Sequence, residues 1–178
     1  MKHDNLNFTL NIIIPTYRRN HYLFNCLSSI IASFINSSGN NQIIISIFDN
    51  NPLNNIEEKI QKLPMLQGLR ICYVKRKENI GGRKNVVHSL LDAHKRSPSD
   101  AYVFVSDDDI VLPQFISTYC HEFRNGSDAI VSSCFIKDDS TSNKRKIHSH
   151  RLEPVRPCSP ENNKIQLIMA SGLLSGRG

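Results

Sequence analysis

The apolar residues of this chain alternate between two spacings, and this alternation limits the possible folds more than any other feature. Short β-branched or apolar runs predict strands at 10–14, 43–48, 69–74, 101–105 and 129–136. Between the first four runs and after the fourth, apolar residues recur at helical spacing over 23–34, 56–63, 86–91 and 115–123. Strand–helix–strand units of roughly 30 residues are typical of parallel sheets. We therefore predict an α/β fold with a mostly parallel twisted sheet and helices on both faces.

The pattern changes after residue 136, although 178 residues suit a single domain over 1–178. Residues 137–160 are polar and include the basic run Lys144, Arg145 and Lys146. Because no apolar spacing persists there, we expect an irregular, mobile basic loop. Regular structure is expected to resume at 165–169.

Each of the first four predicted strands leads into a cluster of polar residues. The clusters are Pro15, Thr16, Tyr17, Arg18 and Arg19; Asp49, Asn50 and Asn51; Asn79, Gly81, Gly82, Arg83 and Lys84; and Ser106, Asp107, Asp108 and Asp109. In open parallel sheets the carboxyl ends of the strands share one edge, and ligands bind beyond it. We therefore expect all four clusters to meet at a ligand site.

Three successive carboxylates, Asp107, Asp108 and Asp109, follow the fourth predicted strand. Their mutual repulsion is unfavourable beside a buried strand unless a cation or several hydrogen-bond donors offset it. Mg²⁺ and Mn²⁺ prefer such oxygen ligands and leave positions open for substrate phosphates. If the segment is extended, Asp107 and Asp109 face one ligand and Asp108 turns aside. The alternative is a solvated acidic turn that caps the helix near Pro113.

Two other positions have both a structural and a functional interpretation. Gly81 and Gly82 precede Arg83 and Lys84 at the start of a predicted helix. Free N–H groups at a helix N-terminus, with two cations, suit a diphosphate, whereas most glycine pairs are turns. The spacing is neither that of a P-loop nor GxGxxG. Asp49 either forms a turn with the asparagines that follow it or accepts hydrogen bonds from a base or ribose.

The formal net charge of +6 favours an anionic partner, such as nucleic acid, a phosphorylated small molecule or an anionic membrane surface. The basic stretch at 144–151 has no interleaved aromatic residues, so we expect no nucleic-acid partner. No apolar run approaches the roughly 20 residues of a membrane span, and no secretory signal is evident. We expect no transmembrane segment and a cytoplasmic protein, with peripheral contact at the inner face of a membrane left open.

Cysteine and histidine offer little support for a separate metal site. The five cysteines include no CxxC pair and lie mostly among apolar neighbours, so we expect buried free thiols. His148 and His150 form an HxH pair in the basic stretch, for which a solvated loop is the simpler interpretation.

Four segments, taken in order, form a more specific pattern than any one of them. They are 12–19 (IIIPTYRR), 48–51 (FDNN), 78–85 (ENIGGRKN) and 104–113 (FVSDDDIVLP), with a weaker similarity at 169–174 (MASGLL). This pattern resembles the donor half of the family 2 glycosyltransferases, which have the GT-A fold. The resemblance implies a Rossmann-like nucleotide-sugar-binding core at 10–136 and an incomplete acceptor-side segment at 161–178.

The resemblance also implies roles for individual residues. Thr16, Tyr17 and Asp49 would hold the base, Arg83 and Lys84 would lie near the diphosphate or base, and Asp107 would face the ribose. Asp109, with Asp107, would bind Mn²⁺ or Mg²⁺. The full set of expected nucleotide-binding residues is Pro15, Thr16, Tyr17, Arg19, Asp49, Asn79, Arg83, Lys84, Asp107 and Asp108. The donor would be a UDP-, GDP- or dTDP-sugar.

The implied activity is inverting, metal-assisted transfer of a sugar to an acceptor hydroxyl of a glycan or lipid-linked acceptor, as in lipopolysaccharide or polysaccharide synthesis. Such a transfer needs a general base, which in the family is an aspartate beyond the strand that 169–174 resembles. No carboxylate follows Glu161, and nothing aligns Asp138, Asp139 or Glu153 with that base. The alternative expectation is therefore a truncated, non-catalytic remnant that binds nucleotide sugar.

Overall fold

The computed structural model describes residues 8–127, 129–130, 134–137, 144–147 and 167–169. The strands are β1 (Thr9–Thr16), β2 (Gln42–Asp49), β3 (Leu69–Lys75), β4 (Ala101–Phe104), β5 (Cys134–Lys137), β6 (Lys144–Ile147) and β7 (Leu167–Met169). The helices are α1 (Asn20–Ile35), α2 (Glu57–Gln61), α3 (Gly82–Arg96) and α4 (Phe115–Arg124).

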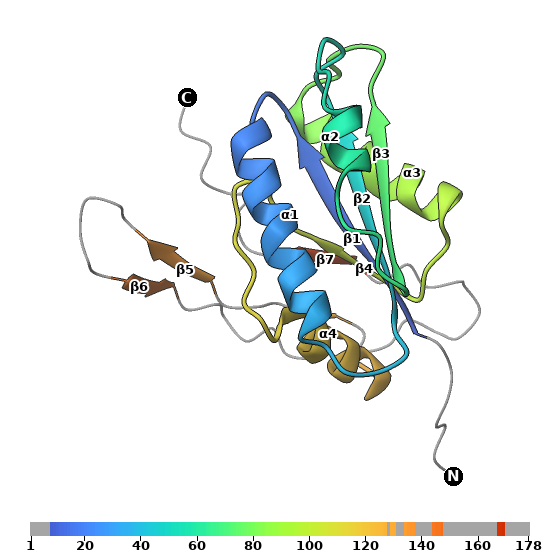
Figure 1. Ribbon diagram of the computed structural model, residues 1–178, viewed down its shortest axis with the longest axis vertical. Helices are drawn as coiled ribbons and strands as arrows, with labels where there is room; N and C mark the ends of the chain where they lie inside the picture. Colours follow the sequence, from blue (N-terminus) through green and yellow to red (C-terminus); the bar gives the residue numbers. More distant parts are fainter. Residues whose placement is uncertain (1–7, 128, 131–133, 138–143, 148–166, 170–178) are drawn as a thin grey trace.

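Five parallel strands form the main sheet, in the order β3-β2-β1-β4-β7 (Figure 1). β1 lies in the middle, between β2 and β4, and its side chains at Leu10, Ile12, Ile13 and Ile14 are fully buried. A near-continuous apolar run is what a parallel strand covered on both faces requires. The predicted α/β fold with a parallel sheet is therefore confirmed.

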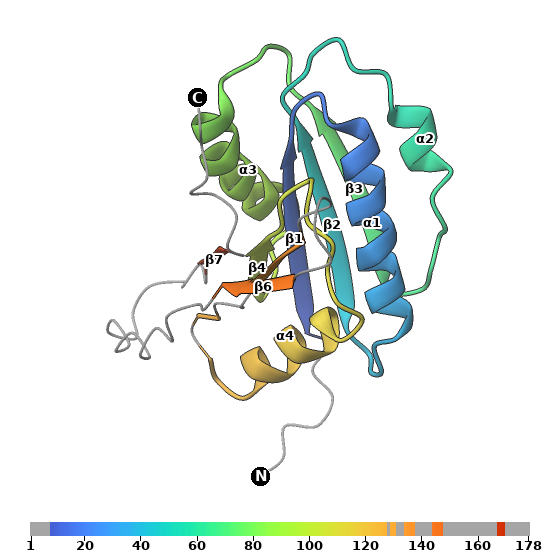
Figure 2. The ribbon, with the colours of Figure 1, turned by 90° about the vertical axis from the view of Figure 1, so that its left-hand side faces the viewer.

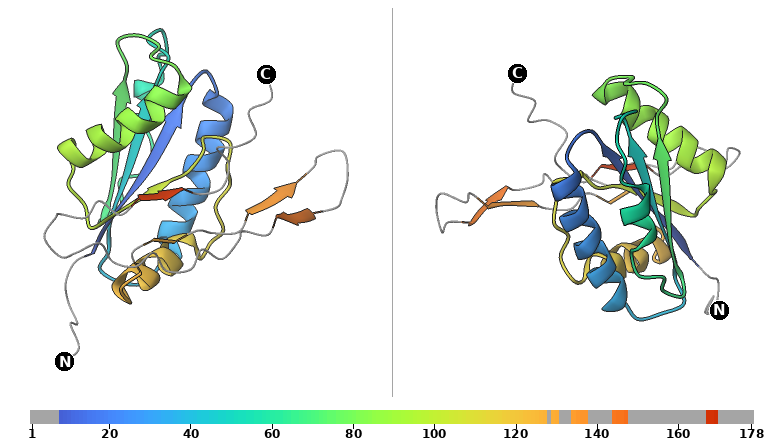
Figure 3. Two further views of the ribbon diagram at one scale, coloured as in Figure 1. Left: turned by 180° about the vertical axis from the view of Figure 1, so that it is seen from behind. Right: turned by 45° about the horizontal axis from the view of Figure 1, so that its top comes forward.

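Helices cover both faces of the sheet, as Figure 2 shows with the sheet between α3 and α1. Alternate residues of β1 point to opposite faces: Ile12 and Ile14 pack in the core that contains residues of α1, α2 and α4, whereas Ile13 packs with α3. Figure 3 shows the same helix layers from behind and with the top of the molecule tilted toward the viewer. On α1, Leu23 and Leu27 are fully buried, and each such side chain stabilises the fold by about 1.5–3 kcal/mol.

The prediction of a fifth strand of the sheet at 129–136 is wrong in part. Residues 129–130 are not in a strand, and β5 pairs with β6 in a separate antiparallel two-stranded sheet (Figure 1). The strand that pairs with the free edge of β4 is instead β7, with Tyr102 opposite Leu167. A β-branched run shows that a segment favours extended backbone, but tertiary contacts choose its partner.

The stretch expected to be an irregular basic loop contains regular structure, because Lys144–Ile147 forms β6. The regular structure expected at 165–169 is observed as β7. Residues 138–143 and 148–166 lie outside the described residues, and with them lie Asp138, Asp139, Glu153, His148 and His150. Among the helices that the structure describes, none is long and apolar enough to cross a membrane.

Buried free thiols are observed at two of the three cysteines for which side chains are described. Cys26 and Cys120 are buried, Cys72 is half-buried, and all three are free. Burial, followed by repulsion from Asp109, raises the pKa of the Cys26 thiol to about 12. Burial likewise raises the pKa of Cys120 to about 11.

These two thiols are expected to resist alkylation in the native protein. At pH 8, fewer than about one in a hundred of either thiol is ionised, and the thiolate is the reactive species. Iodoacetamide should therefore modify Cys72 first and reach Cys26 and Cys120 only after unfolding in guanidinium, as site-resolved peptide mass spectrometry would show. Equal labelling of the three thiols in native protein would contradict the packing described.

Candidate functional site

The four polar loops meet at the carboxyl edge of the sheet, and those after β1, β2 and β3 lie at the top of Figures 1 and 2. Hydrogen bonds join neighbouring loops directly. The hydroxyl of Thr16, after β1, donates to Oδ2 of Asp107, after β4, at 2.6 Å. The backbone N–H of Asn50, after β2, donates to the carbonyl of Thr16 at 2.9 Å, and its Nδ2 donates to Oδ1 of Asn79, after β3, at 2.7 Å. The predicted convergence of the four clusters is confirmed by these contacts.

Asp107 is the most deeply buried of the three successive carboxylates, with 4% of its surface exposed. Besides the hydrogen bond from Thr16, Asp107 accepts one at its Oδ1 from Nη1 of Arg19, at 3.4 Å. The same Nη1 lies 2.7 Å from Oδ2 of the exposed Asp108. Arg19, predicted as a nucleotide-binding residue, is therefore the cation that bridges Asp107 and Asp108.

The extended backbone on which the predicted orientation of the three carboxylates rests is not observed. The backbone N–H of Asp109 donates to the carbonyl of Ser106 at 3.1 Å, so residues 106–109 form a turn and are not extended. In this turn Asp108, not Asp109, shares the arginine with Asp107. Side chains alternate between two faces only in extended backbone, so this rule does not orient the three carboxylates in the turn.

The cluster carries more negative charge than its partners neutralise. Burial raises the pKa of Asp107, and repulsion from Asp108 adds to it, against the opposing effects of Thr16 and Arg19. Burial also raises the pKa of Asp109, with further repulsion from Asp108 and then Asp107. Among the described residues, Arg19 is the cation paired with this cluster, and it contacts only Asp107 and Asp108. A second cation beside the three carboxylates would therefore be favourable.

The donor set fits a divalent metal bound jointly with a ligand. Within the described residues, no group of three or more His, Cys, Asp or Glu side chains could hold a metal alone. Mg²⁺ and Mn²⁺ sites that act on phosphates commonly use only one or two carboxylates, and substrate phosphates and water complete the shell. Asp109 and Asp107 would be such a pair, and Asp109 lies outside the contacts made by Arg19.

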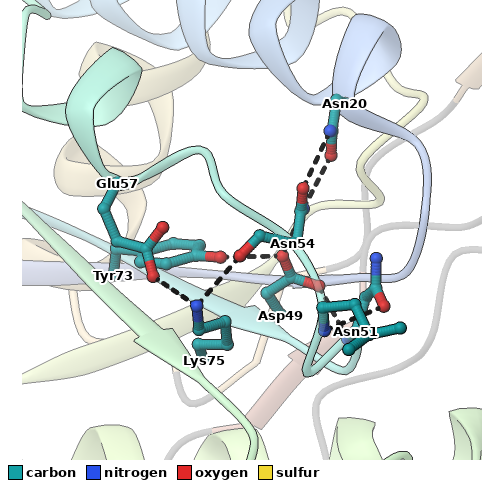
Figure 4. A network of polar contacts seen from close by, with 8 residues as sticks. Asn20, Asp49, Asn51, Asn54, Glu57, Tyr73 and Lys75 are labelled. Carbon is teal, nitrogen blue, oxygen red and sulfur yellow. Dashed lines mark hydrogen bonds and ion pairs between the residues drawn. The ribbon is translucent and has the colours of Figure 1, made fainter.

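Asp49 lies at the centre of a buried network rather than on an open surface (Figure 4). It is fully buried at the end of β2. Its Oδ1 accepts the backbone N–H of Asn51 at 2.8 Å. Its Oδ2 accepts Nδ2 of Asn54 at 2.5 Å and the hydroxyl of Tyr73 at 2.8 Å. The structure thus favours the turn-forming interpretation of Asp49 over direct contact with a base.

The network continues into the neighbouring elements. Asn54 exchanges two hydrogen bonds with Asn20, the first residue of α1, at 3.0 and 2.8 Å. Lys75 donates to the carbonyl of Asn54 at 2.9 Å and pairs with Glu57 at 2.8 Å. The roles of Asn20, Asn54 and Tyr73 were not predicted from the sequence. The run of asparagines around Asp49 was the available signal, because asparagine commonly stabilises turns through its side chain.

In the first turn of α3, the backbone N–H groups of residues 82–84 have no partner among the described residues, which agrees with the prediction for this helix start. Gly81 has a φ of +82° and precedes the helix, which has neither a capping side chain nor an acidic residue in its first turn. Added Cβ atoms at Gly81 and Gly82 would meet nothing within 4 Å, so the backbone there is open to a ligand. Arg83 and Lys84 are exposed in the same turn.

The remaining predicted residues lie in β1 and directly after it. Pro15 is half-buried and pairs with Phe48 in the sheet register. Tyr17 is 37% exposed, and the guanidinium of Arg18 lies 5.0 Å from its ring centroid. Arg18 has a φ of +57°, a left-handed conformation that is uncommon for a residue with a side chain. Tyr17 is therefore an accessible ring at the rim of the carboxylate site.

Comparisons with known proteins define the class of protein to which this site belongs. The family model for glycosyl transferase family 2 matches residues 11–172 of this chain. The chain belongs to this family. A comparison with curated protein sequences gives no match.

Solved structures with the same fold include several of S. aureus TarS. The structure of TarS 1–349 has a TM-score of 0.56 and 18% identity, and the match covers 70% of this chain and 35% of that chain. TarS 1–349 in complex with UDP has a TM-score of 0.53 and 19% identity, and the match covers 70% of this chain and 35% of that chain. The complex with UDP-GlcNAc has a TM-score of 0.54 and 19% identity, with 70% of this chain and 34% of that chain covered. The α/β fold expected from the family resemblance is thus confirmed, and the matched part spans about a third of these TarS chains.

Proposed function

We propose that this chain binds a nucleotide-sugar donor through a nucleoside diphosphate and a divalent metal, as the donor-binding part of a glycosyltransferase. The observation that carries the proposal is the carboxylate cluster, in which Asp107 is buried against Thr16 while Asp109 lacks the arginine that Asp107 and Asp108 share. The UDP and UDP-GlcNAc complexes of TarS, which has the same fold, support this class of ligand.

The residues of the site divide the work of holding such a donor. Thr16 fixes the carboxylate of Asp107 by its hydrogen bond, so that this group is oriented before a ligand arrives. Asp109 and Asp107 would hold Mn²⁺ or Mg²⁺, which when bound stabilises the charge of a departing diphosphate. The open first turn of α3, with Arg83 and Lys84, offers N–H groups and positive charge to phosphate oxygens.

Base recognition falls to the residues that lie at the surface of this edge. Tyr17 presents an accessible ring on which a base can stack. Asp49, which is buried, holds the loop after β2 through its hydrogen bonds with Asn51 and Asn54. The proposed reaction is transfer of the sugar to an acceptor hydroxyl with inversion at the anomeric carbon, for which a carboxylate base is required. The acceptor class that we propose is a glycan or a lipid-linked saccharide.

Calorimetry with UDP, GDP and dTDP, each with Mn²⁺ and with EDTA, tests the donor site. At least one diphosphate is expected to bind at least about tenfold more tightly with Mn²⁺, because the metal links the carboxylates to the phosphates. A single-stranded oligonucleotide serves as the comparison ligand. Tighter binding of the oligonucleotide than of any diphosphate, with a steep loss of affinity as salt rises, would replace this proposal with nucleic-acid binding.

A further inference from the structure

Two asparagine side chains join the loop after β2 to the start of α3, and we call this pair, Asn50 and Asn79, the asparagine clasp. Nδ2 of Asn50 donates to Oδ1 of Asn79 at 2.7 Å. Oδ1 of Asn50 accepts the backbone N–H of Ile80 at 2.9 Å, and Oδ1 of Asn79 accepts that of Gly81, also at 2.9 Å. The clasp therefore fixes the backbone of the two residues that precede α3.

Asn50 also connects this clasp to the carboxylate cluster. It is 2% exposed, and its own N–H donates to the carbonyl of Thr16. The hydroxyl of Thr16 in turn donates to Asp107. A series of hydrogen bonds thus connects the cluster after β4, through Thr16 and Asn50, to Gly81, and it joins all four loops of the sheet edge.

The rest of α3 has its own attachment to the sheet. Nδ2 of Asn85 donates to the carbonyl of Phe48 at 3.1 Å, and Nε of Arg76 donates to Oδ1 of Asn85 at 3.1 Å. Val86 and Leu90 pack on the face of the sheet that contains Phe48. Removal of the clasp should therefore leave α3 in place and release only the loop before it.

We propose that Asn50 is a positioning residue that sets the first turn of α3 at a fixed place relative to Asp107. This inference rests on the proposed function, in which the cluster and the helix start hold opposite sides of one diphosphate. Asn50 is buried and reaches the helix start only through Asn79 and Ile80, so its effect on a ligand is indirect. Its contribution should appear with ligands that have a second phosphate and be small with those that have one.

Hydrogen exchange of the ligand-free protein tests the clasp without reference to any nucleotide. In Asn50→Ala, the amides of Ile80 and Gly81 should exchange at least about tenfold faster, because both lose their support. Asn50→Asp keeps an oxygen for Ile80 but loses the donor to Asn79, so Gly81 alone should be affected. Asn55→Ala, an exposed asparagine of the same loop, is the matched control and should change neither amide. Unchanged exchange at both amides in Asn50→Ala would overturn the inference.

Binding of UDP and UMP with Mn²⁺ then tests the consequence. Asn50→Ala should lower the affinity for UDP about tenfold and the affinity for UMP less than about twofold. Asn55→Ala should change neither affinity. Equal weakening of both ligands would assign Asn50 a general structural role and overturn its positioning role. If the unchanged protein binds neither UDP nor any other diphosphate, the proposed function fails, while the exchange rates still decide whether the clasp holds the helix start.

Discussion

Replacement of Asp109 by Asn is expected to abolish Mn²⁺-dependent binding of UDP, with a loss of at least about 100-fold in affinity. The amide retains the shape of the side chain but removes the charge that a divalent cation requires. Since burial and neighbouring carboxylates raise the pKa of Asp109, its ionised form is unfavourable in the metal-free fold. Asp109→Asn should therefore leave the metal-free protein at least as stable as before. Calorimetry with Mn²⁺ measures the affinity for UDP, and thermal unfolding in EDTA measures the stability of the metal-free protein.

Glu58→Gln is the matched control for this experiment. It removes one negative charge from an exposed position on α2, where no metal is proposed. It should leave the affinity for UDP within about twofold, because the charge lies outside the cluster. If Asp109→Asn bound UDP with unchanged Mn²⁺ dependence, the assignment of the metal to this carboxylate would be wrong. A marked loss of stability in Asp109→Asn would show instead that its charge supports the turn at 106–109.

Replacement of Asp49 by Asn is expected to destabilise the protein by about 2–3 kcal/mol. The buried carboxylate accepts hydrogen bonds from three donors, and an amide in its place turns an N–H group toward at least one of them. A donor that faces another donor without water is left unsatisfied, and this penalty is larger than the value of the bond itself. Urea unfolding followed by circular dichroism gives the change in free energy.

A graded comparison separates this role from contact with a base. Tyr73→Phe removes one of the three donors and leaves Asp49 with the other two, so a loss of about 1 kcal/mol is expected. If Asp49 instead served mainly to bind a base, Asp49→Asn would weaken UDP strongly and barely change stability. That outcome would restore the role implied by the family resemblance and contradict the importance of the network in Figure 4.

The sequence was sufficient to predict the sheet but not all of its strands. β1, β2 and β3 were predicted because β-branched runs of their length, followed by helical spacing, have few other solutions in a soluble fold. β7 contributes only three residues to the sheet, and its partner β4 lies more than 60 positions earlier. Nothing local marks such a pairing, so the longer run at 129–136 was assigned to the sheet instead.

At the site, residue types were predicted better than contacts. The convergence of four loops follows from parallel topology alone, which is why Thr16 and Asp107 could be placed together in advance. The bridging role of Arg19 could not be predicted, because it depends on a turn at 106–109 where extended backbone was assumed. The role of Asp49 depends on Tyr73, which reaches it from another strand.

The central place of β1 also affects the order in which this chain can fold. Its two neighbours are β2, about 30 positions later, and β4, about 90 positions later, so both of its edges are paired only once residue 104 is available. Until then β1, with its buried apolar side chains, has an open edge that another chain could pair with. During synthesis, the interval between β2 and β4 is thus when the nascent chain is most prone to aggregate and has the greatest need of a chaperone.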